Sequence, residues 1–187
     1  VIILSKDKKY DFKMDYYNSD GTWETFCANG ARCAVKYLNQ KKLIEDSTTF
    51  VAGDGEHKAK ININTISIKM RTPKLLSNEI KVNNFKGQLI DSGAQHFCIH
   101  VKDINKLDDI EKLGRKIRNS KIFMPKGVNV NFVEFKKTNL LNVCTYEKGV
   151  EKIMLSCGSG SIASAFYLSK NNIIDSPMES ISDGGKL

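Results

Sequence analysis

Two cysteines, Cys27 and Cys157, open short segments of the same pattern, and this pattern is suited to proton transfer. Residues 27–31 read CANGA and residues 157–161 read CGSGS, so each cysteine precedes a small residue, then Asn or Ser, then glycine. Each segment leads into a stretch that ends in Tyr-Leu and has the composition of a helix. The sequence therefore predicts two helices, one in each half of the chain, with a thiol at the start of each.

The predicted helix ends suggest how the two thiols could act on an amino acid. A helix N-terminus offers unpaired N–H groups and a partial positive charge, so it binds a carboxylate and lowers the pKa of a thiol placed there. Two such ends around one substrate would let one thiolate remove the Cα proton while the opposite thiol protonates the other face. Gly30, Gly158 and Gly160 would let the backbone approach the substrate closely. This chemistry requires neither a metal nor pyridoxal phosphate, and we expect no cofactor.

The other cysteines favour simpler interpretations. A single cysteine is more often a small buried hydrophobe than a reactive group, and we expect Cys33, Cys98 and Cys144 to lie in the core. The five cysteines are odd in number and include no CxxC pair, which argues against both a disulfide framework and a zinc site. We therefore expect reduced thiols in a cytoplasmic protein. A thiol hydrolase that uses His96 as its base stays open at this point.

The composition of the chain limits its partners. The 187 residues carry a formal net charge of +8, but the basic residues are spread along the chain and alternate with acidic ones. No dense basic block with interleaved aromatic residues indicates nucleic-acid binding. No apolar run has the length of a membrane span, and the apolar start is too short for a signal peptide. A small-molecule substrate is the partner we expect, with neither nucleic acid nor membrane; a homodimer is compatible with the sequence.

Hydrophobic periodicity predicts alternating strands and helices along the chain. A polar stretch at residues 76–86 is interpreted as a link between two α/β halves. Strands are expected at residues 1–4, 10–16, 47–52 and 58–70, in two pieces within 87–101, and at 127–136 and 142–147. Helices are expected at residues 29–38, 103–119 and 158–168.

Several short motifs resemble those of the diaminopimelate epimerase family. Residues 26–33, FCANGARC, resemble its M-C-G-N-G-x-R-C motif, and residues 155–160, LSCGSG, resemble L-A/S-C-G-T-G. The remaining similarities are NSDG at 18–21 to N-A-D-G, GAQH at 93–96 to G-N-P-H, GVNVNF at 127–132 to V-N-V-x-F, and TYEKGV at 145–150 to Y-E-R-G-V. The motifs occur in the family's order and span nearly the whole chain.

The resemblance implies an isomerase that is independent of pyridoxal phosphate and interconverts LL- and meso-diaminopimelate, in the synthesis of lysine and peptidoglycan precursors. It implies roles for particular residues: Cys27 and Cys157 as acid/bases; the backbone of Ala28, Asn29, Gly30, Gly158 and Ser159 for the α-carboxylate; Asn18, Asn129 and Lys148 for the distal end; and Glu147 and His96 for positioning and tuning the reacting centre.

The resemblance also implies an α+β fold. It would have two pseudo-symmetric halves, each a curved, barrel-like mixed β-sheet wrapped around a central helix, with the active site between them. We expect the halves to be residues 1–80, carrying Cys27, and residues 81–187, carrying Cys157. The family's G-x-G-N-D-F segment, and the strands that follow its P-G-G-x-L motif, lead us to expect a first half incomplete at its start and a second half incomplete at its end. Residues 183–187, DGGKL, resemble that last motif.

Departures from the family motifs are concentrated at the distal end of the expected substrate. Lys148 replaces an arginine, Ala94 an asparagine and Gln95 a proline, while Ile153 and Met154 replace a Glu-Thr pair. A lysine cannot form the bidentate clamp that an arginine forms on a carboxylate. Two alternatives therefore stay open: a racemase of another amino acid, such as histidine, and a non-catalytic remnant that binds a carboxylate.

Overall fold

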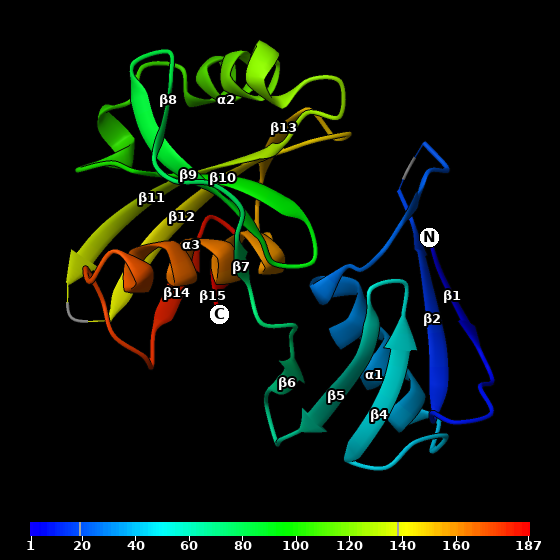
Figure 1. Cartoon of the computed structure of the whole chain (residues 1–187). Coiled ribbons are helices and arrows are strands. Elements are labelled where there is room, and N and C mark those ends of the chain that lie inside the picture. The colour runs from blue at the N-terminus through cyan, green and yellow to red at the C-terminus, as the bar shows by residue number, and fades with distance from the viewer. Residues whose placement is uncertain (19, 138) are drawn as a thin grey trace. The chain divides into compact units, whose positions relative to one another are not determined.

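The computed structural model describes residues 1–18, 20–137 and 139–187, and it confirms the predicted α+β class. The chain divides into two compact units, Val1–Thr72 and Pro73–Leu187. Each unit contains a mixed β-sheet and a 13-residue helix that begins directly after one of the two cysteines (Figure 1).

The first unit is a six-stranded sheet with one helix. Its strand order is β1-β2-β4-β5-β6, and β3 pairs with β2. Strands β2 and β4 run parallel, so the chain between them must cross back over the sheet, and α1 makes this crossing. The elements are β1 (Ile2–Ser5), β2 (Phe12–Tyr17), β3 (Trp23–Glu24), α1 (Ala28–Gln40), β4 (Ser47–Ala52), β5 (Gly55–Ile61) and β6 (Ile66–Lys69).

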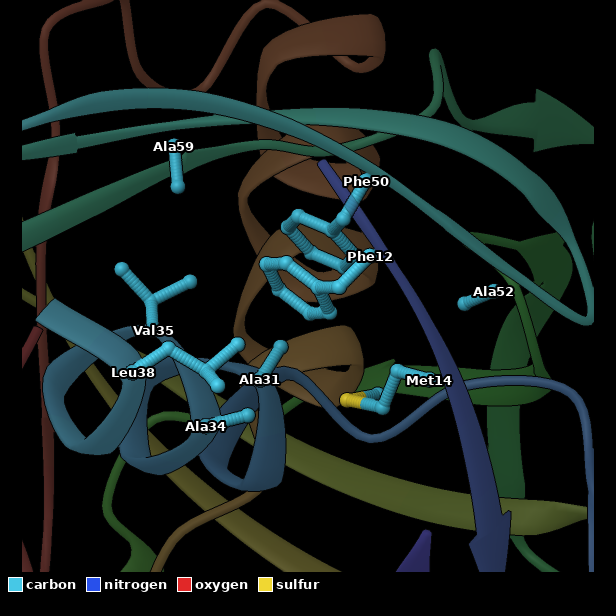
Figure 2. Packing of buried hydrophobic residues seen from close by; sticks show 9 residues of the cluster. All are labelled: Phe12, Met14, Ala31, Ala34, Val35, Leu38, Phe50, Ala52 and Ala59. Atoms are coloured by element: carbon cyan, nitrogen blue, oxygen red, sulfur yellow. The ribbon is translucent and has the colours of Figure 1, made fainter. Parts of the chain in front are cut away.

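Small residues on one face of α1 pack against aromatic residues of the sheet. Figure 2 shows the side chains of the helix lying toward the rings of Phe12 and Phe50, which stack with their centroids 4.8 Å apart. The buried helix residues fall three and four positions apart: Ala28, Ala31, Ala34, Val35 and Leu38. Cys33 lies outside this stripe and is exposed, so the prediction that it belongs to the core is wrong.

The second unit is a nine-stranded sheet with helices on both faces. Its strand order is β15-β14-β12-β11-β10-β9-β7, with β8 paired to β9 and β13 to β12. The strands are β7 (Lys74–Leu75), β8 (Ile80–Val82), β9 (Phe85–Asp91), β10 (Gln95–His100), β11 (Asn129–Lys137), β12 (Leu140–Glu147), β13 (Lys152–Met154), β14 (Glu179–Ser182) and β15 (Gly185–Lys186). Residues 76–86 are therefore not an unpaired link, because they contain β8 and the start of β9.

Side chains of the central strands point alternately to the two faces of this sheet, and apolar residues on both faces form two cores. Phe97 and Phe132 belong to the core that α2 (Ile110–Arg118) covers, whereas Cys98 and Val133 belong to the core under α3 (Gly158–Lys170). Cys98 is fully buried, as predicted, and burial raises the pKa of its thiol. Cys144 is only half-buried, and it packs against the first of these cores.

The second predicted helix is shorter in the structure than in the prediction. Residues 103–119 form a 3-10 turn, η1 (Ile104–Lys106), and then α2; a further turn, η2 (Lys121–Phe123), follows. Asp109 interrupts the helix with a φ of 43° and caps α2 by accepting a hydrogen bond from the Lys112 N–H. The apolar residues of this segment pack against the core from both the turn and the helix: Ile104, Leu107, Ile110, Leu113 and Ile117.

The two units contain the same sequence of strand pairings. In the first, β1 pairs antiparallel with β2, β2 with β3, and β4 with β5, while β2 and β4 are parallel. In the second, β11, β12, β13, β14 and β15 repeat these pairings in the same order. Both helices also end alike, with Lys42 and Asn172 at φ values of 57° and 56°. The predicted relationship between two halves thus has a basis in the topology of each unit.

Candidate active site

Cys27 and Cys157 cap their helices with nearly identical geometry. Their φ and ψ angles are −130° and 108° at Cys27, and −131° and 108° at Cys157. Each sulfur accepts a hydrogen bond from the backbone N–H of the glycine three residues later, Gly30 or Gly160, at 3.4 Å. Both thiols are half-buried. The prediction that each cysteine begins a helix is confirmed.

The glycines in the first helical turns are closely packed. A Cβ on Gly30 would lie 2.8 Å from Ile2 Cδ1, and a Cβ on Gly160 would lie 2.7 Å from Thr145 Oγ1. Both distances are shorter than contacts that real Cβ atoms make. Each helix therefore starts close against its own sheet, and the glycine that donates to the sulfur cannot be enlarged without moving a neighbour.

A buried polar network extends from Cys157 into the interior of the second unit. The Ser159 hydroxyl lies 3.5 Å from Cys157 Sγ and 3.0 Å from Nε2 of His96, a residue of β10. On the other side of the imidazole, Nδ1 lies 3.0 Å from Asn131 Oδ1. Burial lowers the pKa of His96 to about 4, so the imidazole is neutral at pH 7. Ser92 Oγ donates to the Ser159 carbonyl at 2.8 Å and anchors the same turn.

Asn129 and Lys148 meet at the end of the β11–β12 pair. The buried Asn129 side chain accepts a hydrogen bond from the Lys148 backbone N–H at 2.8 Å, which fixes the turn after β12. Glu147 is the last residue of β12 and is half-buried. The second unit thus holds the predicted site residues His96, Asn129, Glu147, Lys148, Cys157, Gly158 and Ser159.

The first unit holds the predicted site residues Asn18, Cys27, Ala28, Asn29 and Gly30. Asn18 follows β2, and its side-chain amide donates to Glu24 at 3.4 Å. Asn29 accepts a hydrogen bond from the Arg32 guanidinium within the first turns of α1. The NSDG motif that contains Asn18 also includes Ser19, which lies outside the described residues.

Sequence reasoning missed Asn131 and Ser92, which complete the network around His96. Asn131 is fully buried in the middle of β11, among Val130, Phe132 and Val133. A polar residue in such an apolar run must find hydrogen-bond partners, and this was the available signal. Its partners were not predictable, because they lie on β10 and α3.

In residues 1–18, 20–137 and 139–187, no cluster of three or more His, Cys, Asp or Glu side chains could hold a metal ion. Within the same ranges, no helix is long and apolar enough to cross a membrane.

Comparison with known proteins relates the whole chain to one enzyme family. The family model described as diaminopimelate epimerase matches residues 88–187. The diaminopimelate epimerase of Flavobacterium psychrophilum is 37% identical over 191 residues, which cover all of this chain and 72% of that protein. The enzyme of the same name from Aquifex aeolicus is 36% identical over 171 residues, covering 88% of this chain and 61% of that protein.

Solved structures show the same fold at much lower identity. A hydroxyproline epimerase from Agrobacterium vitis matches 98% of this chain and 64% of its own with a TM-score of 0.73 at 15% identity. A phenazine biosynthesis protein from Bacillus anthracis matches 89% of this chain and 64% of its own with a TM-score of 0.65 at 14% identity. These likenesses concern the fold alone. The sequence relatives and the family model go further: the chain belongs to the diaminopimelate epimerase family.

Proposed function

We propose that this protein is an isomerase that interconverts LL- and meso-diaminopimelate with two thiols and no cofactor. The observation that carries the proposal is the repeated cap geometry, in which Cys27 and Cys157 each begin a helix and accept a hydrogen bond from its first turn. Membership of the diaminopimelate epimerase family supports the substrate.

In the proposed reaction, the two thiols act on opposite faces of one Cα. One cysteine, as thiolate, takes the Cα proton, and the electron pair of the broken C–H bond moves into the α-carboxylate. The other cysteine, as thiol, then donates its proton to the opposite face and becomes the thiolate. Protons and electrons balance without an oxidant or reductant, so the chemistry calls for no redox group.

Backbone N–H groups at the helix starts would stabilise the charge that develops on the carboxylate. Ala28, Asn29 and Gly30 begin α1, and Gly158 and Ser159 begin α3. Donors held in place by a helix act as an oxyanion hole, because they need no reorganisation when charge develops. This is the role we assign to the two small-residue segments.

The distal end of the substrate would be bound by Asn18, Asn129 and Lys148. The hydrogen bond from the Lys148 N–H to Asn129 holds these two residues together, which supports a shared role. Lys148 offers the distal carboxylate a single flexible charge, whereas an arginine would offer a planar fork. Glu147 and His96 would position the reacting centre. We also propose that the protein acts in the cytoplasm; a homodimer stays a prediction, which sedimentation analysis tests.

The proposal is tested by α-hydrogen exchange in D₂O, followed by proton NMR, with diaminopimelate isomers and histidine supplied separately. Exchange should occur with diaminopimelate and fall by roughly 10²–10⁴-fold in Cys27→Ala and in Cys157→Ala, since each removes an acid/base group. Cys33→Ala is the matched control, because Cys33 is exposed on the same helix that Cys27 caps.

Two outcomes would contradict the proposal in different ways. Exchange with histidine alone would keep the two-thiol chemistry and overturn the substrate. No exchange with either amino acid, in folded and reduced protein, would favour a carboxylate-binding protein without catalysis.

A further inference from the structure

The orientation of the buried Asn131 side chain is fixed by its neighbours on α3. Its amide nitrogen lies 2.7 Å from the Gly160 carbonyl oxygen and 2.9 Å from Ser164 Oγ. A carbonyl oxygen only accepts, so the NH₂ group must face Gly160 and the amide oxygen must face His96. That oxygen also only accepts. His96 therefore carries a hydrogen on Nδ1 and donates it to Asn131 over 3.0 Å.

This tautomer determines the direction of the next hydrogen bond. Burial lowers the pKa of His96 to about 4 and outweighs the opposing effects of the Asn131 hydrogen bond and the Asp91 charge. The imidazole is therefore neutral, and its Nε2 is an acceptor. The Ser159 hydroxyl, 3.0 Å away, must donate its one hydrogen to Nε2. Its oxygen then presents only lone pairs to Cys157 Sγ at 3.5 Å.

We propose that Asn131 is a positioning residue that, through His96 and Ser159, holds Cys157 as the protonated thiol when no substrate is bound. A hydroxyl that faces a sulfur with its lone pairs accepts from S–H and offers nothing to a thiolate, so it favours the neutral form. This opposes the preference for thiolate that a helix N-terminus confers. The inference rests on the proposed function, in which one thiol must be protonated and the other ionised before substrate binds. It assigns Cys157 as the resting acid.

The experiment measures the pH dependence of Cys157 alkylation without substrate. Intact protein is pulsed with isotope-labelled iodoacetamide between pH 5 and 10, and each cysteine is quantified by peptide mass spectrometry. Cys98, which is fully buried, reports in the same sample whether a variant is folded. The midpoint for Cys157 gives its apparent pKa, a readout that a purely structural role for Asn131 would not move.

Two variants break the network at different points. Ser159→Ala removes the acceptor of the thiol hydrogen. Asn131→Leu frees His96 to adopt the Nε2–H tautomer, which would turn the Ser159 hydrogen toward the sulfur. Since one hydrogen bond contributes about 1 kcal/mol, both should lower the Cys157 midpoint by roughly one pH unit.

Two matched controls should leave the midpoint unchanged. Ser159→Thr keeps the hydroxyl. Ser164→Ala removes the second of the two Asn131 contacts on α3, together with the hydrogen bond between Ser164 and Cys98, and the Gly160 carbonyl still fixes the amide.

A Ser159→Ala midpoint that is unchanged or raised overturns the proposal, as does an unchanged midpoint in folded Asn131→Leu, or a Ser164→Ala shift equal to that of Ser159→Ala. If Cys98 becomes alkylated in Asn131→Leu, that variant is unfolded, and the comparison of Ser159→Ala with Ser164→Ala decides. Because the assay needs no turnover, a missing α-hydrogen exchange would refute the proposed function without affecting this result.

Discussion

Acid should destabilise the second unit through one buried imidazole. The folded protein lowers the pKa of His96 from its ordinary 6.5 to about 4, because the side chain is fully buried. Between these values the unfolded chain binds a proton that the folded one excludes, so the free energy of unfolding falls as the pH falls. The slope approaches about 1.4 kcal/mol per pH unit, and the total loss between pH 6.5 and 4 is about 3 kcal/mol. Above pH 6.5 this contribution is fully present.

The assay must report on the second unit alone. The single tryptophan, Trp23, lies in the first unit, so its fluorescence is unsuitable. Hydrogen exchange by mass spectrometry on peptides from β10 and β11 gives the opening free energy of the strand that carries His96 and of its parallel neighbour. His96→Gln removes the titrating imidazole and leaves every other titrating group in place. The difference between the two proteins in the slope of opening free energy against pH therefore gives the contribution of His96. If the opening free energy changed with pH equally in the two proteins between pH 6.5 and 4, His96 would make no such contribution.

Two substitutions test packing in the separate units. His57→Phe removes the hydrogen-bond partner of the buried Asp54 side chain, which lies 2.8 Å from His57 Nε2, and should cost the first unit about 1–3 kcal/mol. Tryptophan fluorescence in urea measures this loss, and an unchanged unfolding midpoint would contradict it. Gly114→Ala gains about 1 kcal/mol of helix propensity, but its Cβ would lie 2.6 Å from Tyr146 Cβ, and such overpacking costs about 1–3 kcal/mol. We therefore expect a net loss of stability, measured by hydrogen exchange in α2. A stabilised protein would show that the tyrosine can move.

The long elements could be predicted because the spacing of their apolar residues indicated both the type of element and its ends. The strand expected at residues 47–52 is found at Ser47–Ala52, and the two helices that follow the cysteines start within one residue of their predicted positions. Each thiol caps its own helix, so the motif that suggested chemistry also marked the boundary. The helix over residues 103–119 was predicted too long, because the turn before Asp109 continues the same apolar spacing.

Six of the short strands could not be predicted from local sequence. These strands of two to four residues show too little alternation of apolar and polar residues to recognise, and they form because a longer partner offers unpaired backbone groups. The strands that were missed in this way are β3, β7, β8, β13, β14 and β15. Strand β3, for example, is a two-residue partner of β2.

The candidate site was predictable where its residues are close in sequence. Cys27 and Cys157 and the small residues that follow them form two contiguous segments, and the structure places each at a helix start. The network behind Cys157 joins β10, β11 and α3, and only the folded second unit brings His96, Asn131 and Ser159 together. Residue types could suggest that His96 matters, but not which side chain fixes its tautomer.

If Cys27 and Cys157 act on one substrate, mild oxidation with diamide should join them, and disulfide mapping would identify the product. A disulfide requires Cα atoms about 4.4–6.8 Å apart, so it forms only if the two thiols approach one another in solution. We expect a Cys27–Cys157 disulfide as the main product, with its formation suppressed by diaminopimelate. Oxidation that leaves both thiols free, or that joins either one mainly to the exposed Cys33, would contradict it.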